Sequence, residues 1–389
     1  MANLDAYSRQ NLQNSDIERV CQTLTSDYLT QGPAVAQFEQ KISEYCEVPY
    51  CVAVSSATAG LHLALMALEV NHDSLVWTSA NTFASTANVA RLLGADIDFI
   101  DIDQATWMIS PQTLEKKLID ATGNSQPTPS VVILVHFAGI SYDLQPFVEL
   151  AEKYQFRIIE DAAHAFGASY GKYPVGSGAH SDLTVFSFHA IKPMTTGEGG
   201  AVTTTNPDLF KKIQALRTHG VIKDSAEFRN VPDGAWYYEQ HTLGLNYRIT
   251  DFQCALGLAQ IDRYPAFLER RREIVDLYNQ HLPEELCTAQ AVPDGCLSAH
   301  HIYPVLVSTD QRRQLFDHLR SKNIGVNVHY IPVYRHPYHA DKGTYSACPN
   351  TDDYYSRTIS LPLHTHLSDD EVGTVCTEVK AFLETNTNG

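Results

Sequence analysis

The chain has 389 residues, enough for two or three domains or for one large α/β domain with a smaller partner. A hydrophobic fraction of 44% supports a substantial core and excludes a disordered chain. The formal net charge of −17 argues against nucleic acid or an anionic membrane as a partner, although a cleft with local positive groups could still bind a small anion.

The eight cysteines form no CxxC pair and are expected to be reduced thiols, and the 17 histidines show no spacing typical of a metal site. The first residues lack the basic and apolar regions of a signal peptide, and no apolar run is long enough to span a bilayer. A soluble cytoplasmic protein without a metal is therefore expected.

Short apolar runs alternate with amphipathic stretches through the first two thirds of the chain. Helical patterns cover residues 57–68, 82–93 and 144–154, and the apolar runs begin at Val52, Leu75, Ile97, Val131, Phe156, Leu183 and Gly200. Buried runs separated by helices predict an α/β fold with a mostly parallel central sheet, covered on both faces.

The composition changes after about Gly220. Residues 223–240 are polar and aromatic without a period, which is typical of a long functional loop. Helical patterns at 249–261, 266–281, 311–322 and 369–384, with extended segments at 301–307 and 326–330, indicate a smaller C-terminal α+β domain. We place the large domain at residues 1–255 and the small domain at 256–389, and we interpret the run Arg270-Arg-Arg as a solvated helix face.

One lysine stands where an apolar strand ends and a glycine-rich segment begins. Lys192 follows Val185-Phe-Ser-Phe-His-Ala-Ile and precedes Gly197, Gly199 and Gly200. A desolvated lysine loses its proton more readily than one in water and can form an imine with an aldehyde, and glycines let the backbone approach a ligand. Considered without other evidence, a lysine such as Lys192 is more often a solvated surface residue.

Two acids close the apolar run Ile158-Ile-Glu-Asp-Ala-Ala-His, at a strand end where α/β sheets bind ligands. A carboxylate at this place could keep the ring nitrogen of pyridoxal phosphate (PLP) protonated. Asp161 is the candidate, because strand alternation turns Glu160 to the opposite face. The alternative role for Asp161 is that of a helix N-cap.

The segment Ser55-Ser-Ala-Thr-Ala-Gly lies between a predicted strand and a predicted helix. Hydroxyls and backbone N–H groups at a helix start bind anions, which suits a cofactor phosphate. Ordinary helix capping is the alternative.

Together, in this order, these segments resemble the fold type I PLP enzymes, and more closely the DegT-type sugar aminotransferases. The resemblance runs from Tyr28-Leu-Thr-Gln-Gly-Pro through Gly244-Leu-Asn-Tyr-Arg-Ile-Thr-Asp to Ser360-Leu-Pro-Leu. Within that family it is closest to the enzymes that aminate C4 of a UDP-linked 4-keto-6-deoxy-N-acetylhexosamine in pseudaminic acid synthesis. The enzymes that aminate a UDP-4-ketopentose are also similar.

The resemblance implies catalytic roles for three residues. Lys192 would hold PLP as a Schiff base, Asp161 would pair with the pyridine nitrogen, and His164 would lie near the ring hydroxyl. The cofactor would cycle through its amino form (PMP), with glutamate as the donor. The other implied cofactor contacts are Phe83, stacked on the ring; Ser56, Ala57, Thr58 and Ser187, at the phosphate; and Asn246, from the neighbouring subunit of a homodimer.

The resemblance also implies a nucleotide-sugar site. Its expected residues are Tyr7, Asp27, Tyr28, Leu29, Thr30, Asn246, His329, Tyr330, Ile331 and Pro332. For Phe83 and for the segment that begins at His329, simple core packing is the alternative.

Particular residues argue against three other functions. A sugar dehydratase of this fold would carry histidine in place of Lys192, a noncatalytic sensor would not need Lys192 and Asp161, and an NAD enzyme would show GxGxxG after its first strand. His189 could be taken for a general base, but a structural hydrogen-bonding role is favoured, because a freed Lys192 is itself the natural proton shuttle.

Overall fold

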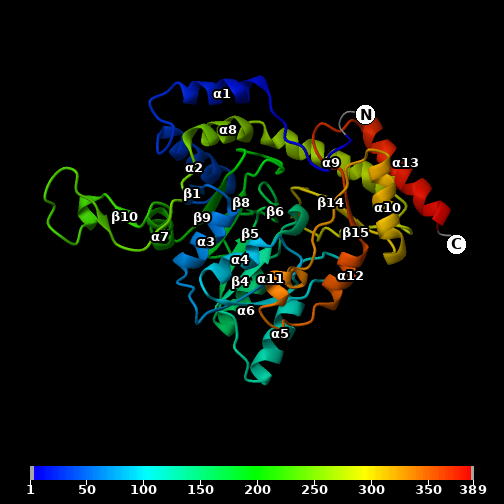
Figure 1. The fold of residues 1–389 in the computed structure, drawn as a ribbon, viewed down its shortest axis with the longest axis horizontal. Helices are drawn as coiled ribbons and strands as arrows, with labels where there is room; N and C mark the ends of the chain where they lie inside the picture. Colours follow the sequence, from blue (N-terminus) through cyan, green and yellow to red (C-terminus); the bar gives the residue numbers. More distant parts are fainter. Residues whose placement is uncertain (1–3, 387–389) are drawn as a thin grey trace.

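A seven-stranded sheet forms the centre of the molecule in the computed structural model, which describes residues 4–386 (Figure 1). Its strands are β1 (Tyr50–Val54), β2 (Leu75–Ser79), β3 (Asp96–Ile100), β4 (Val131–Val135), β5 (Arg157–Asp161), β8 (Leu183–Ser187) and β9 (Gly200–Thr204). They lie in the order β1-β9-β8-β5-β4-β2-β3, and only β9 runs antiparallel to its neighbours. The carboxyl ends of β5 and β8, which carry Asp161 and Ser187, therefore meet at one edge of the sheet.

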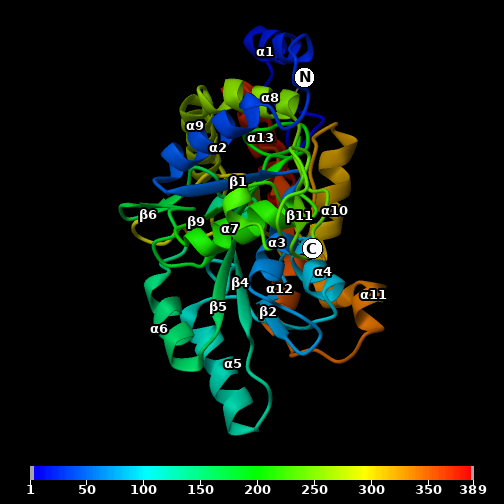
Figure 2. The same ribbon diagram turned by 90° about the vertical axis from the view of Figure 1, so that its left-hand side faces the viewer.

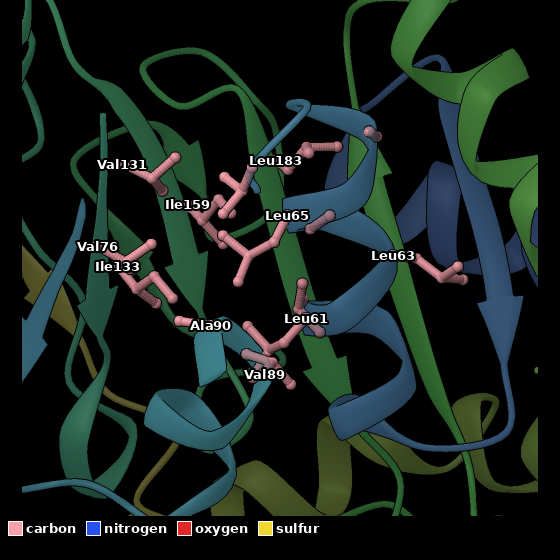
Figure 3. Packing of buried hydrophobic residues seen from close by; sticks show 14 of the residues in the cluster. Leu61, Leu63, Leu65, Val76, Val89, Ala90, Val131, Ile133, Ile159 and Leu183 are labelled. Atoms are coloured by element: carbon pink, nitrogen blue, oxygen red, sulfur yellow. The ribbon is translucent and has the colours of Figure 1, made fainter. Parts of the chain in front are cut away.

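Helices cover both faces of this sheet because successive strand residues point to opposite sides. In β4, Val131 and Ile133 join the core cluster that contains α3 (Ala57–Ala67), α4 (Ser85–Leu92) and α7 (Pro207–Arg217). Figure 3 shows Leu65 of α3 packed beside Ile159, and Leu61 beside Val89 of α4, on this side.

The opposite face packs against two further groups of helices. Val132 and Leu134 of β4 join the cluster of α5 (Pro111–Gly123) and α6 (Gln145–Tyr154). Toward β1, the same face is covered by α2 (Pro33–Cys46) and α8 (Asp251–Ile261). The predicted α/β architecture with a mostly parallel, doubly covered sheet is confirmed.

The C-terminal part forms a separate core around a three-stranded antiparallel sheet of β12 (Thr288–Ala289), β14 (Tyr303–Leu306) and β15 (Thr358–Leu361). Helices α10 (Thr309–Ser321) and α13 (Asp369–Asn386) pack on it. Helix α9 (Tyr264–His281) joins two cores. Phe267 belongs to the cluster with α2 and α8 beside the central sheet, and Ile274 belongs to the C-terminal core. The domain division at residue 255, which lies within α8, stays a prediction.

The remaining elements are short or peripheral. Helix α1 (Asn14–Leu24) lies along α8 at one end of the molecule, as both views show (Figure 1, Figure 2). The others are β6 (Ser169–Tyr170), β7 (Tyr173–Pro174), β10 (Val221–Ile222), β11 (Glu239–Gln240), β13 (Cys296–Leu297), α11 (Pro337–Ala340), α12 (Pro349–Arg357), and three 3₁₀ turns at Phe137–Gly139, Ser225–Glu227 and Val333–Arg335. Among residues 4–386, no helix combines the length and the apolar character needed to cross a bilayer.

The polar segment at 223–240 is an arm that projects from the body beyond β10 and β11 (Figure 1). The Glu239 carboxylate orders it by accepting hydrogen bonds from the backbone N–H groups of Arg229 and Asn230 and from the Tyr237 hydroxyl. These bonds hold the pKa of Glu239 at about 2, although burial acts to raise it.

Two expectations were wrong. Residues 326–330 form no strand, since Asn327 makes only an isolated bridge to Ser360. The run Arg270-Arg-Arg is not a solvated face throughout, because Arg271 is buried and donates to the carbonyl oxygens of His300, His301 and Leu363. Arg271 lies three and seven residues before Ile274 and Tyr278, on the buried side of α9.

Candidate active site

A cavity of about 410 Å³ opens at the carboxyl ends of β5 and β8. Its wall combines these strand ends with the first turn of α3, the residues before α4 and the segment 327–330. Of the residues predicted for the site, the cavity is lined by Tyr7, Ser56, Ala57, Thr58, Phe83, Asp161, His164, Ser187, Lys192, His329 and Tyr330.

Asp161 is the last residue of β5 and its carboxylate is buried. The Thr86 hydroxyl donates to Oδ2 at 2.7 Å, and the Ala163 N–H donates to Oδ1 at 3.2 Å. Burial raises the pKa of Asp161 above its ordinary value, while the bond from Thr86 acts to lower it. A cationic ring nitrogen in the cavity would complete the pairing of this carboxylate.

Glu160 points away from the cavity. Its carboxylate accepts hydrogen bonds from His136 at 2.7 Å, Ser181 at 2.6 Å and Thr184 at 2.7 Å. These partners lie on the other side of β5, as strand alternation predicts.

Lys192 lies in the turn that follows β8, where its backbone N–H donates to the His189 carbonyl. Burial lowers the pKa of the Lys192 ammonium to about 8, while the charge of Asp161 acts to raise it. Nζ lies 3.4 Å from Nε2 of His301. A lysine in this state has an appreciable neutral fraction near neutral pH, which a nucleophilic amine requires.

His164 is held in one tautomer by its neighbours. Nδ1 accepts a hydrogen bond from the Ala138 N–H at 3.3 Å, so in the neutral ring the proton is on Nε2, which lies 3.1 Å from the Tyr330 hydroxyl. Burial lowers the pKa of His164 well below its ordinary value, which keeps the ring neutral. His164 can therefore donate a hydrogen bond toward Tyr330 but carries no charge.

The first turn of α3 has the geometry of an anion cradle. Ser56 is the N-cap, with its hydroxyl accepting from the Ala59 N–H, while Ala57 and Thr58 begin the helix. A β-carbon on Gly200 would lie 2.7 Å from the Ala57 nitrogen, so glycine is required for β9 to pass beneath this turn. Backbone N–H groups at a helix start, together with the helix dipole, favour a phosphate.

Phe83 is not a core residue, since its side chain is 61% exposed at the cavity. Its ring centroid lies 6.1 Å from that of Tyr330. An exposed aromatic face beside a buried carboxylate suits a planar heteroaromatic ring.

Some predicted residues lie outside this cavity. Ile331 and Pro332 follow the lining segment, and Asn246 is exposed, paired through a bridge to Thr218. Asp27, Tyr28, Leu29 and Thr30 are exposed between α1 and α2. The single chain therefore does not bring these seven residues to Lys192.

His189 lines the cavity with a half-exposed side chain, 3.7 Å from the Glu198 carboxylate. Two further residues near the chemical groups were missed from the sequence, Thr86 and His301. Thr86 lies within the helix predicted at 82–93, one turn after Thr82 and close to the candidate Phe83, which is a usable signal. His301 approaches Lys192 across 109 residues, which no local pattern indicates.

The groups present fit PLP. An amine with a lowered pKa, a buried carboxylate, an anion cradle and an exposed aromatic ring line one cavity. No metal ligand set is needed for this chemistry.

Comparison with known proteins gives the same family along the whole chain. Residues 10–380 match the model of the DegT/DnrJ/EryC1/StrS aminotransferase family. The chain is 36% identical over 366 residues to a UDP-4-amino-4,6-dideoxy-N-acetyl-beta-L-altrosamine transaminase of Campylobacter jejuni, covering 93% of each chain.

Solved structures agree in fold. A putative sugar aminotransferase of Streptococcus pneumoniae, Spr1654 in its PMP form, superposes with a TM-score of 0.89 at 31% identity, covering 97% of this chain and 98% of that one; its PLP form superposes with a TM-score of 0.88. Helicobacter pylori PseC, an aminotransferase of pseudaminic acid biosynthesis, superposes with a TM-score of 0.88 at 28% identity, covering 98% and 99%.

These matches confirm the predicted fold type, the predicted aminotransferase activity with PLP, and the resemblance to PseC-type enzymes. The chain belongs to the DegT/DnrJ/EryC1/StrS aminotransferase family.

Proposed function

We propose that this sugar aminotransferase moves an amino group from glutamate to the C4 keto group of a UDP-linked 4-keto-6-deoxy-N-acetylhexosamine. The observation that carries the proposal is the meeting of Lys192, Asp161 and the α3 N-terminus around one cavity. An amine, a carboxylate and an anion cradle in one enclosure match the three polar parts of PLP.

The proposal assigns each part to named groups. Ser56, Ala57, Thr58 and Ser187 would hold the phosphate, and Asp161 would face the ring nitrogen. When bound, PLP supplies an electron sink for the carbanion formed on the substrate.

Lys192 would carry the cofactor and then move the proton. Because the pKa of its Nζ is about 8, part of the amine is uncharged near neutral pH. The uncharged amine can take a proton from the substrate carbon and then return it. His164 would remain neutral and orient the ring hydroxyl, because burial keeps its pKa well below the ordinary value.

The sugar would occupy the side of the cavity formed by Tyr7, Asn327 and His329. Burial lowers the pKa of His329 to about 3, so its ring is a neutral hydrogen-bonding group. Neutral polar groups of this kind suit sugar hydroxyls and an N-acetyl amide. The choice of a UDP-linked N-acetylhexosamine over a UDP-4-ketopentose is supported by the Campylobacter relative.

The site would be completed by a second copy of the chain. Among the described residues that line the cavity, Lys192 is the only lysine or arginine, so a nucleoside diphosphate needs further positive charge from outside. Asn246 and Arg248, beyond the base of the arm, could supply a donor and a charge to the partner's cavity. A C2 dimer would then have two equivalent shared sites.

Exposed apolar side chains on the arm (Val231, Trp236) and just after it (Leu243) favour this dimer. Val231 is 90% exposed, Trp236 is 75% exposed and Leu243 is 78% exposed. Large apolar groups in such number mark an interaction surface. The cytoplasmic location stays a prediction.

The direct test is a purified-enzyme assay with a panel of UDP- and dTDP-linked 4-keto sugars, with glutamate as donor and the product measured by mass. The proposal expects an amino sugar from the UDP-linked 4-keto-6-deoxy-N-acetylhexosamine. Turnover of a UDP-4-ketopentose alone would show that the sugar assignment is wrong, and the absence of any aminated product across the panel would contradict the activity.

A further inference from the structure

The buried side chain of His301 lies within hydrogen-bond distance of the reactive amine of Lys192. Its Nε2 lies 3.4 Å from Nζ of Lys192, and among residues 4–386 no other side chain lies within hydrogen-bond distance of that amine. His301 is 1% exposed and does not line the cavity, so it lies behind Lys192 and not beside a substrate.

The backbone of His301 is fixed from two sides. Its N–H donates to the Ala138 carbonyl at 2.8 Å, and its carbonyl accepts from Arg271 at 3.2 Å. A β-carbon on Gly139 would lie 3.1 Å from the His301 nitrogen and 2.8 Å from that of His300, so the turn after β4 packs directly on this segment.

The same turn also holds His164. The Ala138 N–H donates to His164 Nδ1, while the Ala138 carbonyl accepts from His301. The two imidazole rings lie with centroids 4.4 Å apart. One turn therefore contacts both histidines that lie near the lysine and fixes where each of them sits.

The roles of Lys192 and His301 depend on which of the two side chains holds the proton. Burial lowers the pKa of His301 well below its ordinary value, whereas that of Lys192 is about 8. The proton therefore stays on the lysine, and His301 does not act as a base. A neutral imidazole can still accept a hydrogen bond from the ammonium through the lone pair of Nε2.

We infer that His301 is a positioning residue that accepts a hydrogen bond from Lys192 and holds its amine toward the cavity. This requires the proton of the neutral ring to be on Nδ1. That atom is buried without a hydrogen-bond partner among the described residues, which is a cost that a merely structural histidine would not need to bear. The inference rests on the proposed role of Lys192.

The first measurement is the pKa of Lys192 in the full-length chain freed of cofactor. Acetic anhydride labelling over a pH series, followed by peptide mass analysis, gives this value. Other groups that act on Lys192 and His301 are Asp161, His164, His329 and Arg271, and the compared variants keep all of them.

His301→Met removes the acceptor, whereas His301→Gln places an amide oxygen near the position of Nε2. We expect the Lys192 pKa to fall by about one unit in His301→Met, the size expected for one hydrogen bond to a charged group, and to return toward the wild-type value in His301→Gln. Equal pKa values in wild type and His301→Met would overturn the inference.

Steady-state kinetics of the loaded enzyme separate positioning from substrate binding. We expect kcat to fall about tenfold or more in His301→Met, with KM for the keto sugar changed less than about twofold, because His301 does not line the cavity. A raised KM with unchanged kcat would assign His301 to substrate binding instead and overturn the inference.

If His301→Met does not fold, the protonation state of the His301 ring in the wild type tests the inference instead. Nitrogen-15 spectra of the histidine-labelled chain, with the His301 signals assigned by their absence in His301→Gln, should show Nε2 unprotonated and Nδ1 protonated at pH 7. A proton on Nε2 would overturn the inference. Borohydride fixation of PLP on Lys192 in the wild type tests the proposed function by itself, so failure there is distinguishable from failure of the role of His301.

Discussion

Thr86 donates a 2.7 Å hydrogen bond to the carboxylate of Asp161, across 75 residues of sequence. Thr86 belongs to α4 and Asp161 ends β5, so the bond ties a covering helix to the strand end that carries the chemistry. The Thr82 hydroxyl lies 2.8 Å from that of Thr86 and extends the network toward the cavity.

Removal of the Thr86 hydroxyl should change the acid side of the pH profile. The bond stabilises the charged form of Asp161, so Thr86→Val raises a pKa that burial has already raised. The acid limb of kcat/KM should move to higher pH by about one unit, while Thr86→Ser keeps the wild-type profile. Identical acid limbs in wild type and Thr86→Val would show that this bond does not tune Asp161.

The two adjacent acids should differ sharply in function. Asp161→Asn keeps the shape but removes the charge opposite the ring nitrogen, so PLP should still bind while kcat falls by about a thousandfold or more. Glu160→Gln is the matched control: its carboxylate is engaged by His136 behind the sheet, and kcat should change far less. A loss of only a few-fold in Asp161→Asn, measured at saturating cofactor, would refute the assigned role.

Much of the site follows from local sequence because its residues stand at strand ends or helix starts. Lys192, Asp161 and the Ser56 segment are of this kind, and each is where the pattern predicts it. His301 does not stand at a strand end or a helix start. Its position depends on how a segment before β14 packs on the turn after β4.

The charged run in α9 shows a different limit. A run of arginines is usually solvated, but the spacing of Arg271 from Ile274 and Tyr278 indicates the buried face of the helix. Helical periodicity therefore predicts that Arg271 is buried, whereas the charge of the run predicts wrongly that it is solvated. The exposed segment 27–30 is not at the site in the single chain, and the contacts expected of it are with the nucleotide-sugar substrate.

Arg271 should contribute strongly to stability. Arg271→Met leaves three carbonyl oxygens, two of them in buried bonds, without their donor and should lower the free energy of unfolding by about 3 kcal/mol. Arg313→Met, at an exposed position with only a 3.9 Å contact to Asp317, should change it by less than about 0.5 kcal/mol. Thermal melting of both variants measures the difference, and equal melting temperatures would contradict the buried role.

Subunit mixing tests the shared site. Lys192→Ala is combined with a strongly impaired Asn246 variant under conditions that exchange subunits. With shared sites, each mixed dimer contains one site with both defects and one with neither, so activity should recover toward half of the wild-type value in that dimer. If mixed dimers are shown to form and activity does not exceed the sum of the two parents, Asn246 does not act across the interface.

The central claim is that Lys192 carries the cofactor. The PLP-loaded wild-type enzyme should be reduced with sodium borohydride, digested and mapped by peptide mass. We expect the reduced cofactor on the peptide that contains Lys192, and none after the same treatment of Lys192→Ala. Attachment to a different lysine in the wild type, or no attachment at full cofactor occupancy, would contradict it.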